Sequence, residues 1–140
     1  MKFENQCGAY IKHISDVLQR DCNNALQSTG LTLSQLTVLY QLEQAENAQL
    51  TLKELEKSLQ VAQSTAAGII SRLEKKGLVE GFTNNEDKRI KMVRITAKGH
   101  DRFIKSQIHS TQSEAHLLSC LDENEAATLK ALLKKVSENL

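Results

Sequence analysis

Apolar positions recur at steps of three and four residues near both ends of the chain, which is the spacing of one face of an amphipathic helix. The first of these stretches stops at Gly30, the residue type that most often ends a helix. The last two follow Thr96 and Asp122, whose side-chain oxygens can accept from the free amides of a first helical turn. We therefore predict terminal helices over about residues 8–29 and, in two segments, 97–140.

Three shorter helical patterns lie in the middle of the chain. Ser34 stands at the start of the first and is predicted to cap it. The second opens with Thr51-Leu-Lys-Glu54, which fits a capping box: the amide of Glu54 donates to the Thr51 hydroxyl, and the Glu54 carboxylate accepts from the amide of Thr51. The third begins at Gln63 and stops at Gly77, after two lysines that suit the negative end of a helix dipole.

Beyond this glycine the pattern changes from helical spacing to short runs of β-branched and aromatic residues. Residues 78–82 and 90–95 are of this kind, and the segment 83–89 between them is polar. Such a sequence predicts two strands joined as a hairpin with a charged tip. The predicted fold class is therefore mainly α with a two-stranded β wing.

Composition narrows the class of protein. A length of 140 residues with 40% hydrophobic and 25% charged residues is usual for one globular domain. No apolar run approaches the roughly 20 residues that cross a membrane, and the first residues lack a signal peptide, so we expect a cytoplasmic protein with no membrane partner. Cys7, Cys22 and Cys120 are odd in number and lack C-x-x-C spacing, which predicts reduced thiols and no metal site.

Sequence motifs of catalysis are also missing. The chain has no glycine-rich phosphate loop, no H-E-x-x-H and no G-x-S-x-G sequence. We therefore predict that the protein is not an enzyme and uses no cofactor.

Charge is distributed unevenly along the chain. The segment 63–98 has eight basic and four acidic residues, so its net charge is +4, while the whole chain is +1 and the remainder is therefore −3. A basic segment within a mildly acidic protein is typical of a surface that binds nucleic acid.

Two helices joined by a short turn and followed by a hairpin are the layout of a winged helix-turn-helix. The second helix of such a pair enters the major groove of duplex DNA, about 12 Å wide, with its N-terminal side chains toward the base edges. Here those side chains are Gln63, Ser64 and Thr65. Basic residues further along the helix are expected to contact phosphates: Arg72, Lys75 and Lys76.

The hairpin tip supplies a second predicted DNA contact. Arg89 can enter the minor groove, whose negative potential attracts a guanidinium group. Asp87 is expected to receive the guanidinium of Arg89, or of a nearby basic residue, and to orient it. The other predicted contacts on the wing are Asn84, Asn85 and Lys88.

Three segments resemble the MarR (multiple antibiotic resistance regulator) family of bacterial transcription factors. They are Leu-Thr-Leu-Ser-Gln-Leu from Leu31, Arg72-Leu-Glu-Lys-Lys-Gly-Leu-Val79, and Asp87-Lys-Arg89 followed by Val93-Arg-Ile-Thr-Ala-Lys-Gly99. Together with the order of the elements, the resemblance covers nearly the whole chain.

This resemblance implies one winged helix-turn-helix domain over residues 1–140, with a DNA-reading lobe at about 31–98 and dimerisation helices at about 8–29 and 97–140. It also implies a triangular homodimer that represses transcription from a pseudo-palindromic double-stranded operator. A small-molecule effector or a redox signal releases the DNA in such regulators. The effector is expected between the dimerisation helices and the lobe, where Ile11 and Tyr40 are predicted to lie.

Several alternatives stay open. The basic segment can be a solvated charged face, the winged helix can dock another protein, and the apolar terminal helices can close a core within one chain. Cys7, three residues before Tyr10, resembles the reactive cysteine of peroxide-sensing relatives and is a candidate redox residue. His109 and His116 share a helix face but lie about 10.5 Å apart along its axis, too far to bind one metal ion alone.

Overall fold

The computed structural model describes residues 5–140, which form six α-helices, a 3-10 turn and three β-strands. All the helices and both strands that the sequence predicts are present, close to their expected bounds. In chain order the elements are α1 (Cys7–Thr29), α2 (Leu33–Gln44), the 3-10 turn (Glu46–Ala48), β1 (Gln49–Thr51), α3 (Leu52–Leu59), α4 (Gln63–Lys75), β2 (Val79–Thr83), β3 (Lys91–Ile95), α5 (Ala97–Leu117) and α6 (Glu123–Glu138).

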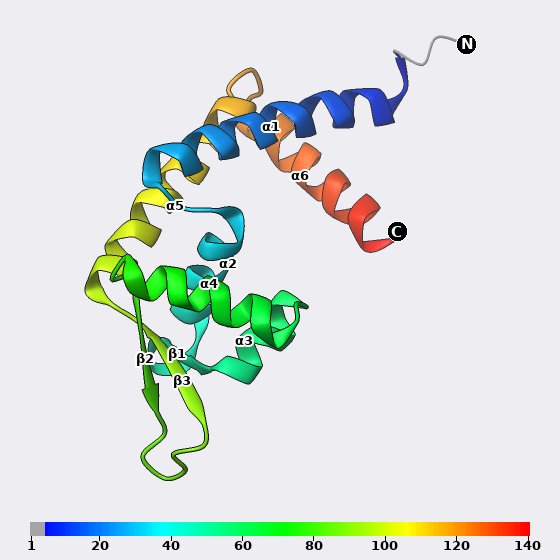
Figure 1. Cartoon of the computed structure of the whole chain (residues 1–140). Coiled ribbons are helices and arrows are strands. Elements are labelled where there is room, and N and C mark those ends of the chain that lie inside the picture. Colours follow the sequence, from blue (N-terminus) through cyan, green and yellow to red (C-terminus); the bar gives the residue numbers. More distant parts are fainter. Residues whose placement is uncertain (1–4) are drawn as a thin grey trace.

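The elements are arranged as a lobe with two helices at its far end. Figure 1 shows α1 and α6 at one end of the molecule and the β2–β3 hairpin projecting from the other. Helix α5 runs from the base of the hairpin to α1, and it contacts both α1 and α2. The lobe therefore carries the helix-turn-helix and the wing, and α5 joins it to the terminal helices.

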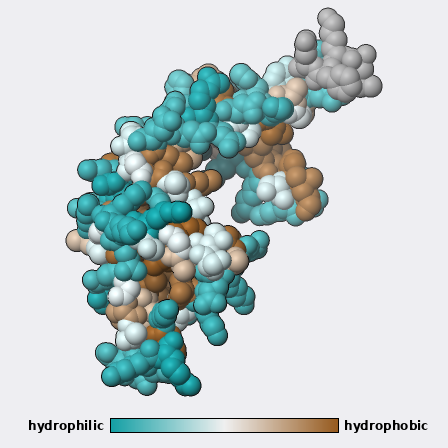
Figure 2. Space-filling model, in the orientation of Figure 1, coloured by the Kyte–Doolittle hydropathy of each residue, from teal (hydrophilic) through white to brown (hydrophobic). Residues whose placement is uncertain are grey.

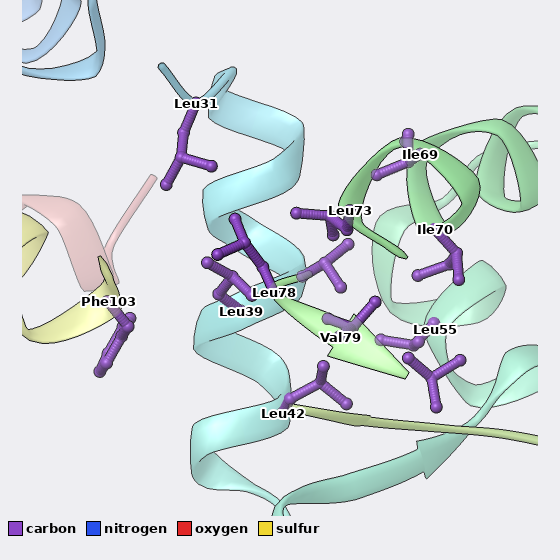
Figure 3. Close-up of a cluster of buried hydrophobic side chains, with 12 residues drawn as sticks. Leu31, Leu39, Leu42, Leu55, Ile69, Ile70, Leu73, Leu78, Val79 and Phe103 are labelled. Atoms are coloured by element: carbon purple, nitrogen blue, oxygen red, sulfur yellow. The ribbon is translucent and has the colours of Figure 1, made fainter. Parts of the chain in front are cut away.

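The hydrophobic core lies inside the lobe (Figure 3). Leu39 and Leu42 of α2, Leu55 of α3 and Leu73 of α4 are fully buried there. Phe103 reaches the cluster from α5. At roughly 25 cal/mol for each Å² of apolar surface removed from water, these buried side chains are the main source of stability of the lobe.

The sheet has three strands rather than the two of the predicted wing. Its order is β1-β3-β2, with both pairs antiparallel, and Leu50 of β1 lies opposite Val93 of β3. The prediction missed β1 because this strand is three residues long and too short to show the period-two alternation of a strand.

Two of the four helix caps that the sequence predicts are confirmed in full. Thr96 and Asp122 cap α5 and α6 as predicted. The predicted cap at Ser34 is wrong, because α2 begins at Leu33 and its cap is Thr32, which accepts from the amide of Gln35 at 3.2 Å. The predicted capping box at Thr51 is confirmed in one of its two bonds: the amide of Glu54 donates to the Thr51 hydroxyl at 3.0 Å, but the Glu54 carboxylate does not accept from the amide of Thr51.

Candidate nucleic-acid interface

Helix α4 has one buried and one exposed face. The buried residues point into the core and are Ala66, Ile69, Ile70 and Leu73. The exposed residues include five of the predicted DNA contacts, namely Gln63, Ser64, Thr65, Arg72 and Lys75. The helix therefore presents polar side chains at its N-terminal end and basic side chains at its C-terminal end to solvent.

The exposed face includes an uncharged polar residue, Ser71, that the sequence analysis did not select. Ser71 is exposed and lies four residues before Lys75, so the two share a helix face. The helical spacing from Lys75 was the signal that could have identified Ser71.

At the start of the helix, the N-cap Ala62 makes no side-chain hydrogen bond, so no side chain there occupies the first amides of α4.

Lys76 is placed differently from the other basic residues of α4. It is the C-cap of the helix, and its Nζ donates to the carbonyl oxygen of Gly30 at 2.5 Å and to Oε1 of Gln35 at 2.8 Å. Two of its three ammonium protons are therefore directed toward the junction of α1 and α2. This is not the position expected of a phosphate contact, so the placement of Lys76 does not support its predicted role in DNA binding.

The loop at the tip of the wing, residues 84–90, is shaped by its own side chains. Oδ1 of Asn84 accepts from the amides of Glu86 at 2.8 Å and Asp87 at 3.3 Å, which is the hydrogen bonding of an Asx turn. Asn84 thus holds the loop, and its amide oxygen is occupied within it. The remaining predicted contacts of the tip, Asn85 and Lys88, are exposed.

Arg89 and Asp87 form a bidentate pair in this loop. Nε and Nη2 of Arg89 donate to Oδ1 and Oδ2 of Asp87, both at 3.1 Å, and the amide of Arg89 also donates to Oδ1 at 3.0 Å. The predicted orienting contact is therefore confirmed. The side-chain hydrogen bond from Arg89 lowers the pKa of Asp87, and the same bond raises the pKa of Arg89, so the pair stays charged.

The guanidinium of Arg89 is nevertheless open to a ligand. The Arg89 side chain keeps 91% of its surface exposed, against 35% for Asp87. One edge of the guanidinium is held by the carboxylate, and the rest of the side chain faces solvent. The pair therefore fixes the direction of a positive charge at the tip without covering it.

Arg94 makes its contacts within the hairpin. Its guanidinium forms an ion pair with Glu80, the residue opposite it on β2, and lies 4.7 Å from the centre of the Phe82 ring. Its charge is thus matched within the sheet. The exposed cations of the wing without an ion-pair partner among residues 5–140 are Lys88 and Lys91, whereas Arg89 is paired with Asp87 but keeps an exposed side chain.

The segment Thr96–Gly99 anchors the base of the wing. The hydroxyl of Thr96 donates to the carbonyl oxygen of Gly77 at 2.6 Å, and the amide of Thr96 donates to that of Leu78 at 3.0 Å. A Cβ atom at Gly99 would lie 2.0 Å from the Leu78 oxygen, so only glycine fits there. These contacts fix the start of α5 against the turn that follows α4 and thereby hold the hairpin beside the helix.

Other kinds of site receive no support within residues 5–140. No group of three His, Cys, Asp or Glu side chains in that range is arranged to hold a metal ion. No helix in the same range has the length and apolar character needed to cross a membrane. The chemistry that these residues offer is exposed positive charge beside hydrogen-bonding side chains, which suits a polyanion.

Comparison with known proteins identifies the family. The MarR family model matches residues 31–91. The multiple antibiotic resistance protein MarR of Escherichia coli is 33% identical over 132 residues, which cover 92% of this chain and 89% of that protein. The chain belongs to the MarR family of transcriptional regulators. The resemblance carried by the three sequence segments is thereby confirmed.

Two further comparisons show how far the similarity extends. The transcriptional repressor MprA of Escherichia coli is 27% identical, and the match covers 91% of this chain and 73% of MprA. A structure of an Escherichia coli MarR mutant complexed with operator DNA is 31% identical, has a TM-score of 0.68, and covers 97% of this chain and 98% of that chain. The winged helix-turn-helix fold is therefore shared over almost the whole length.

The predicted effector residues are separated in this MarR-family chain. Tyr40 lines a groove of about 950 Å³ between α1, α2 and α5, together with Leu18, Leu36 and Phe103. Its ring lies 6.3 Å from that of Phe103. Ile11 is exposed on α1 and is not part of the groove lining.

The candidate redox residue lies far along α1 from this groove. Cys7 is the first residue of α1, and its side chain is exposed. Exposure is one of the two conditions for a redox-sensing thiol, and a lowered thiol pKa is the other. The redox role of Cys7 therefore stays a prediction.

Proposed function

We propose that this MarR-family chain is a homodimeric transcriptional repressor that binds double-stranded DNA. The observation that carries the proposal is the combination, on one lobe, of an exposed polar face of α4 and an exposed Arg89 that Asp87 orients. An α-helix fits the major groove, and a guanidinium group on a wing fits the minor groove. The Escherichia coli MarR structure complexed with operator DNA, 31% identical to this chain, supports the assignment.

In this proposal the exposed residues have three roles. Gln63, Ser64 and Thr65 at the start of α4 contact base edges in the major groove. Basic side chains contact phosphates and set the register of the protein on the duplex. The proposed phosphate contacts are Arg72 and Lys75 on α4, and Lys88 with Asn85 on the wing. Arg89 enters the minor groove. Asn84 and Asp87 shape the loop that carries Arg89.

The proposed dimer uses the terminal helices. Neither α1 nor α6 contains a buried residue within residues 5–140, yet both carry large apolar side chains, and Figure 2 shows brown atoms gathered over α6. A second copy of the chain is the partner that buries such faces in a symmetric regulator. The exposed apolar residues of α1, α5 and α6 are Tyr10, Ile11, Ile14, Ile104, Ile108, Leu132, Leu133 and Val136.

Repression follows from occupancy of the operator. A dimer on a pseudo-palindromic site blocks access of RNA polymerase to the promoter, and MprA, a relative of this chain, is named a transcriptional repressor. The proposed action is binding in the cytoplasm, with no catalytic step.

An effector is proposed to act through the groove beside α5. The groove of about 950 Å³ has apolar walls that include Leu36, Tyr40 and Phe103, and it lies between the lobe and α1. A small apolar or aromatic molecule suits such walls. By binding between the lobe and α1, such a molecule would change the angle between them and lower the affinity of the dimer for DNA.

The test is a DNA titration followed by fluorescence anisotropy. Duplexes that the parent protein selects from a random pool serve as operators. Arg89→Ala is expected to weaken binding by tenfold or more, about 1.4 kcal/mol, because no guanidinium then reaches the minor groove. Lys130→Ala is the control, since Lys130 is an exposed cation on α6, away from the proposed DNA contacts of α4 and the wing. Equal affinities for parent and Arg89→Ala would contradict the proposed role of the wing.

A further inference from the structure

The junction between α1 and α2 receives two cations from distant parts of the chain. Lys76, at the end of α4, donates to the carbonyl oxygen of Gly30 at 2.5 Å. Arg102 of α5 donates from Nη1 to the carbonyl oxygen of Thr29 at 2.6 Å. The C-terminal end of α1 is therefore bonded to both α4 and α5 through charged side chains.

Gln35 makes the Lys76 contact a partly buried one. The Gln35 side chain is only 4% exposed and is the buried polar residue of the part of the chain that the structure describes. Its Oε1 accepts from Nζ of Lys76 at 2.8 Å and from the amide of Thr32 at 3.3 Å, and the second bond completes the capping box of α2. Because a buried oxygen needs its donors, this arrangement favours one position of the lysine.

Lys76 is also fixed through its backbone. Its carbonyl oxygen accepts from Nζ of Lys98, near the start of α5, at 2.9 Å. Its amide donates to the carbonyl oxygen of Arg72 in the last turn of α4 at 3.2 Å. One residue thus has hydrogen bonds to the α1–α2 junction, to α2, to α4 and to α5.

We infer that Lys76 is a positioning residue that sets the orientation of α4 relative to α1, and thereby the separation of the two α4 helices in the homodimer. The inference rests on the proposed dimeric DNA-binding function. In a symmetric dimer the spacing of the operator half-sites must match the separation of the recognition helices. A contact that ties α4 to the dimerisation helix in each protomer therefore determines which half-site spacing is bound.

The neighbouring residue provides a matched control. Lys75 is exposed, and its side chain makes no hydrogen bond or ion pair with any residue between 5 and 140. Lys75→Met and Lys76→Met remove the same charge from adjacent positions, but only the second removes the bonds to Gly30 and Gln35. Lys76→Gln, which is too short to reach both acceptors, is a second variant should Lys76→Met fail to fold.

The first measurement needs no DNA. The labelled protein is the 140-residue chain with Ser71→Cys as the label site and with Cys7, Cys22 and Cys120 changed to serine. Pulsed electron paramagnetic resonance then reports the distance between the spin labels on the two α4 helices of the dimer. We expect similar widths of the distance distribution for parent and Lys75→Met, and an about twofold broader one for Lys76→Met. Gln35→Met should also broaden it, though less, because it removes one of the two hydrogen bonds that Lys76→Met removes, and the double variant should be no broader than Lys76→Met alone.

The second measurement uses operators with one base pair inserted or removed between the half-sites. Parent and Lys75→Met are expected to prefer the original spacing by about tenfold, and Lys76→Met to lose most of that preference. The dependence of affinity on salt separates the two lysines further. Lys75→Met should make the negative slope of log K against log salt shallower, by about 0.9 for each phosphate that the lysine neutralises. Lys76→Met should leave the slope unchanged.

Two results would overturn the inference. One is a distance distribution for Lys76→Met and Lys76→Gln as narrow as that of the parent. The other is a slope of log K against log salt that becomes as shallow in Lys76→Met as in Lys75→Met, which would make Lys76 a phosphate contact. If the parent dimer fails to bind duplex DNA at all, the proposed function fails, while the distance measurement still decides the role of Lys76.

Discussion

The DNA-reading lobe and the two terminal helices obtain their stability in different ways. Within residues 5–140, the buried apolar side chains lie between Leu31 and Val93, with Phe103 of α5 added, and neither α1 nor α6 contributes one. The lobe therefore has a core of its own within one chain. The terminal helices instead expose apolar side chains, which the proposed dimer would bury. Folding of the lobe is expected to be intrinsic to the chain, and order in α1 and α6 to depend on protein concentration.

The largest expected effect is on the core of the lobe. Leu39→Ala removes a fully buried side chain and leaves a cavity, so the free energy of unfolding should fall by about 2–5 kcal/mol. Urea unfolding followed by circular dichroism measures it. Leu33→Ala, on the same helix but 61% exposed, is the control and should change stability by no more than about 0.5 kcal/mol. Comparable losses of stability for both variants would place the core elsewhere.

The next effect concerns the dimer. Leu133→Glu puts a carboxylate on an apolar face of α6, so the dimer dissociation constant should rise about a hundredfold, or about 2.7 kcal/mol. Sedimentation equilibrium gives the constant, and the circular dichroism of the lobe should persist. Leu140→Glu, at a fully exposed position, serves as control. Dimers of unchanged affinity would show that this face of α6 is not the interface.

A smaller effect separates base reading from phosphate binding within α4. Gln63→Ala should change the preference among operator variants by about tenfold, because a side chain at a base edge discriminates between bases. Lys75→Ala should weaken all duplexes alike, because phosphates carry no sequence information. Competition titrations with a panel of single-base operator variants measure both. A uniform loss of affinity for the two variants would refute this division of roles.

The smallest effect is the response of the wing to pH. The hydrogen bonds from Arg89 lower the pKa of Asp87, so the ion pair is complete above the ordinary pKa of an aspartate and breaks only as the pH falls through the lowered value. Wing geometry should thus be constant at neutral and mildly acidic pH. Carbon NMR of the Asp87 carboxyl should show a higher midpoint in Arg89→Ala than in the parent. Identical midpoints would mean that the pair does not form in solution.

The same contrast explains how much could be read from the sequence. The helices, the hairpin and the pairing of Asp87 with Arg89 follow from local signals: helical periodicity, capping residues, and a spacing of two residues in a short loop. The exposed face of α4 follows from the positions of Ala66, Ile69 and Leu73, which fix the buried side.

Features that depend on distant contacts were not predictable in this way. The strand β1 exists because it pairs with β3, more than forty positions along the chain, and its three residues have no pattern of their own. Lys76 has the same local signals as Lys75, yet its ammonium is directed to Gly30 and Gln35, which the fold brings to it. Charge along a helix indicates a candidate phosphate contact, but only the packing of the helix decides which cations are free.

The central claim, that α4 and the wing bind duplex DNA through its phosphates, is tested most directly by the salt dependence of binding. The measurement is the association constant of the parent dimer for a selected duplex over a series of salt concentrations. With three phosphate contacts from each protomer, about six in all, log K should fall against log salt with a slope of about −5. A slope near zero, or no measurable binding to any duplex at low salt, would contradict the claim.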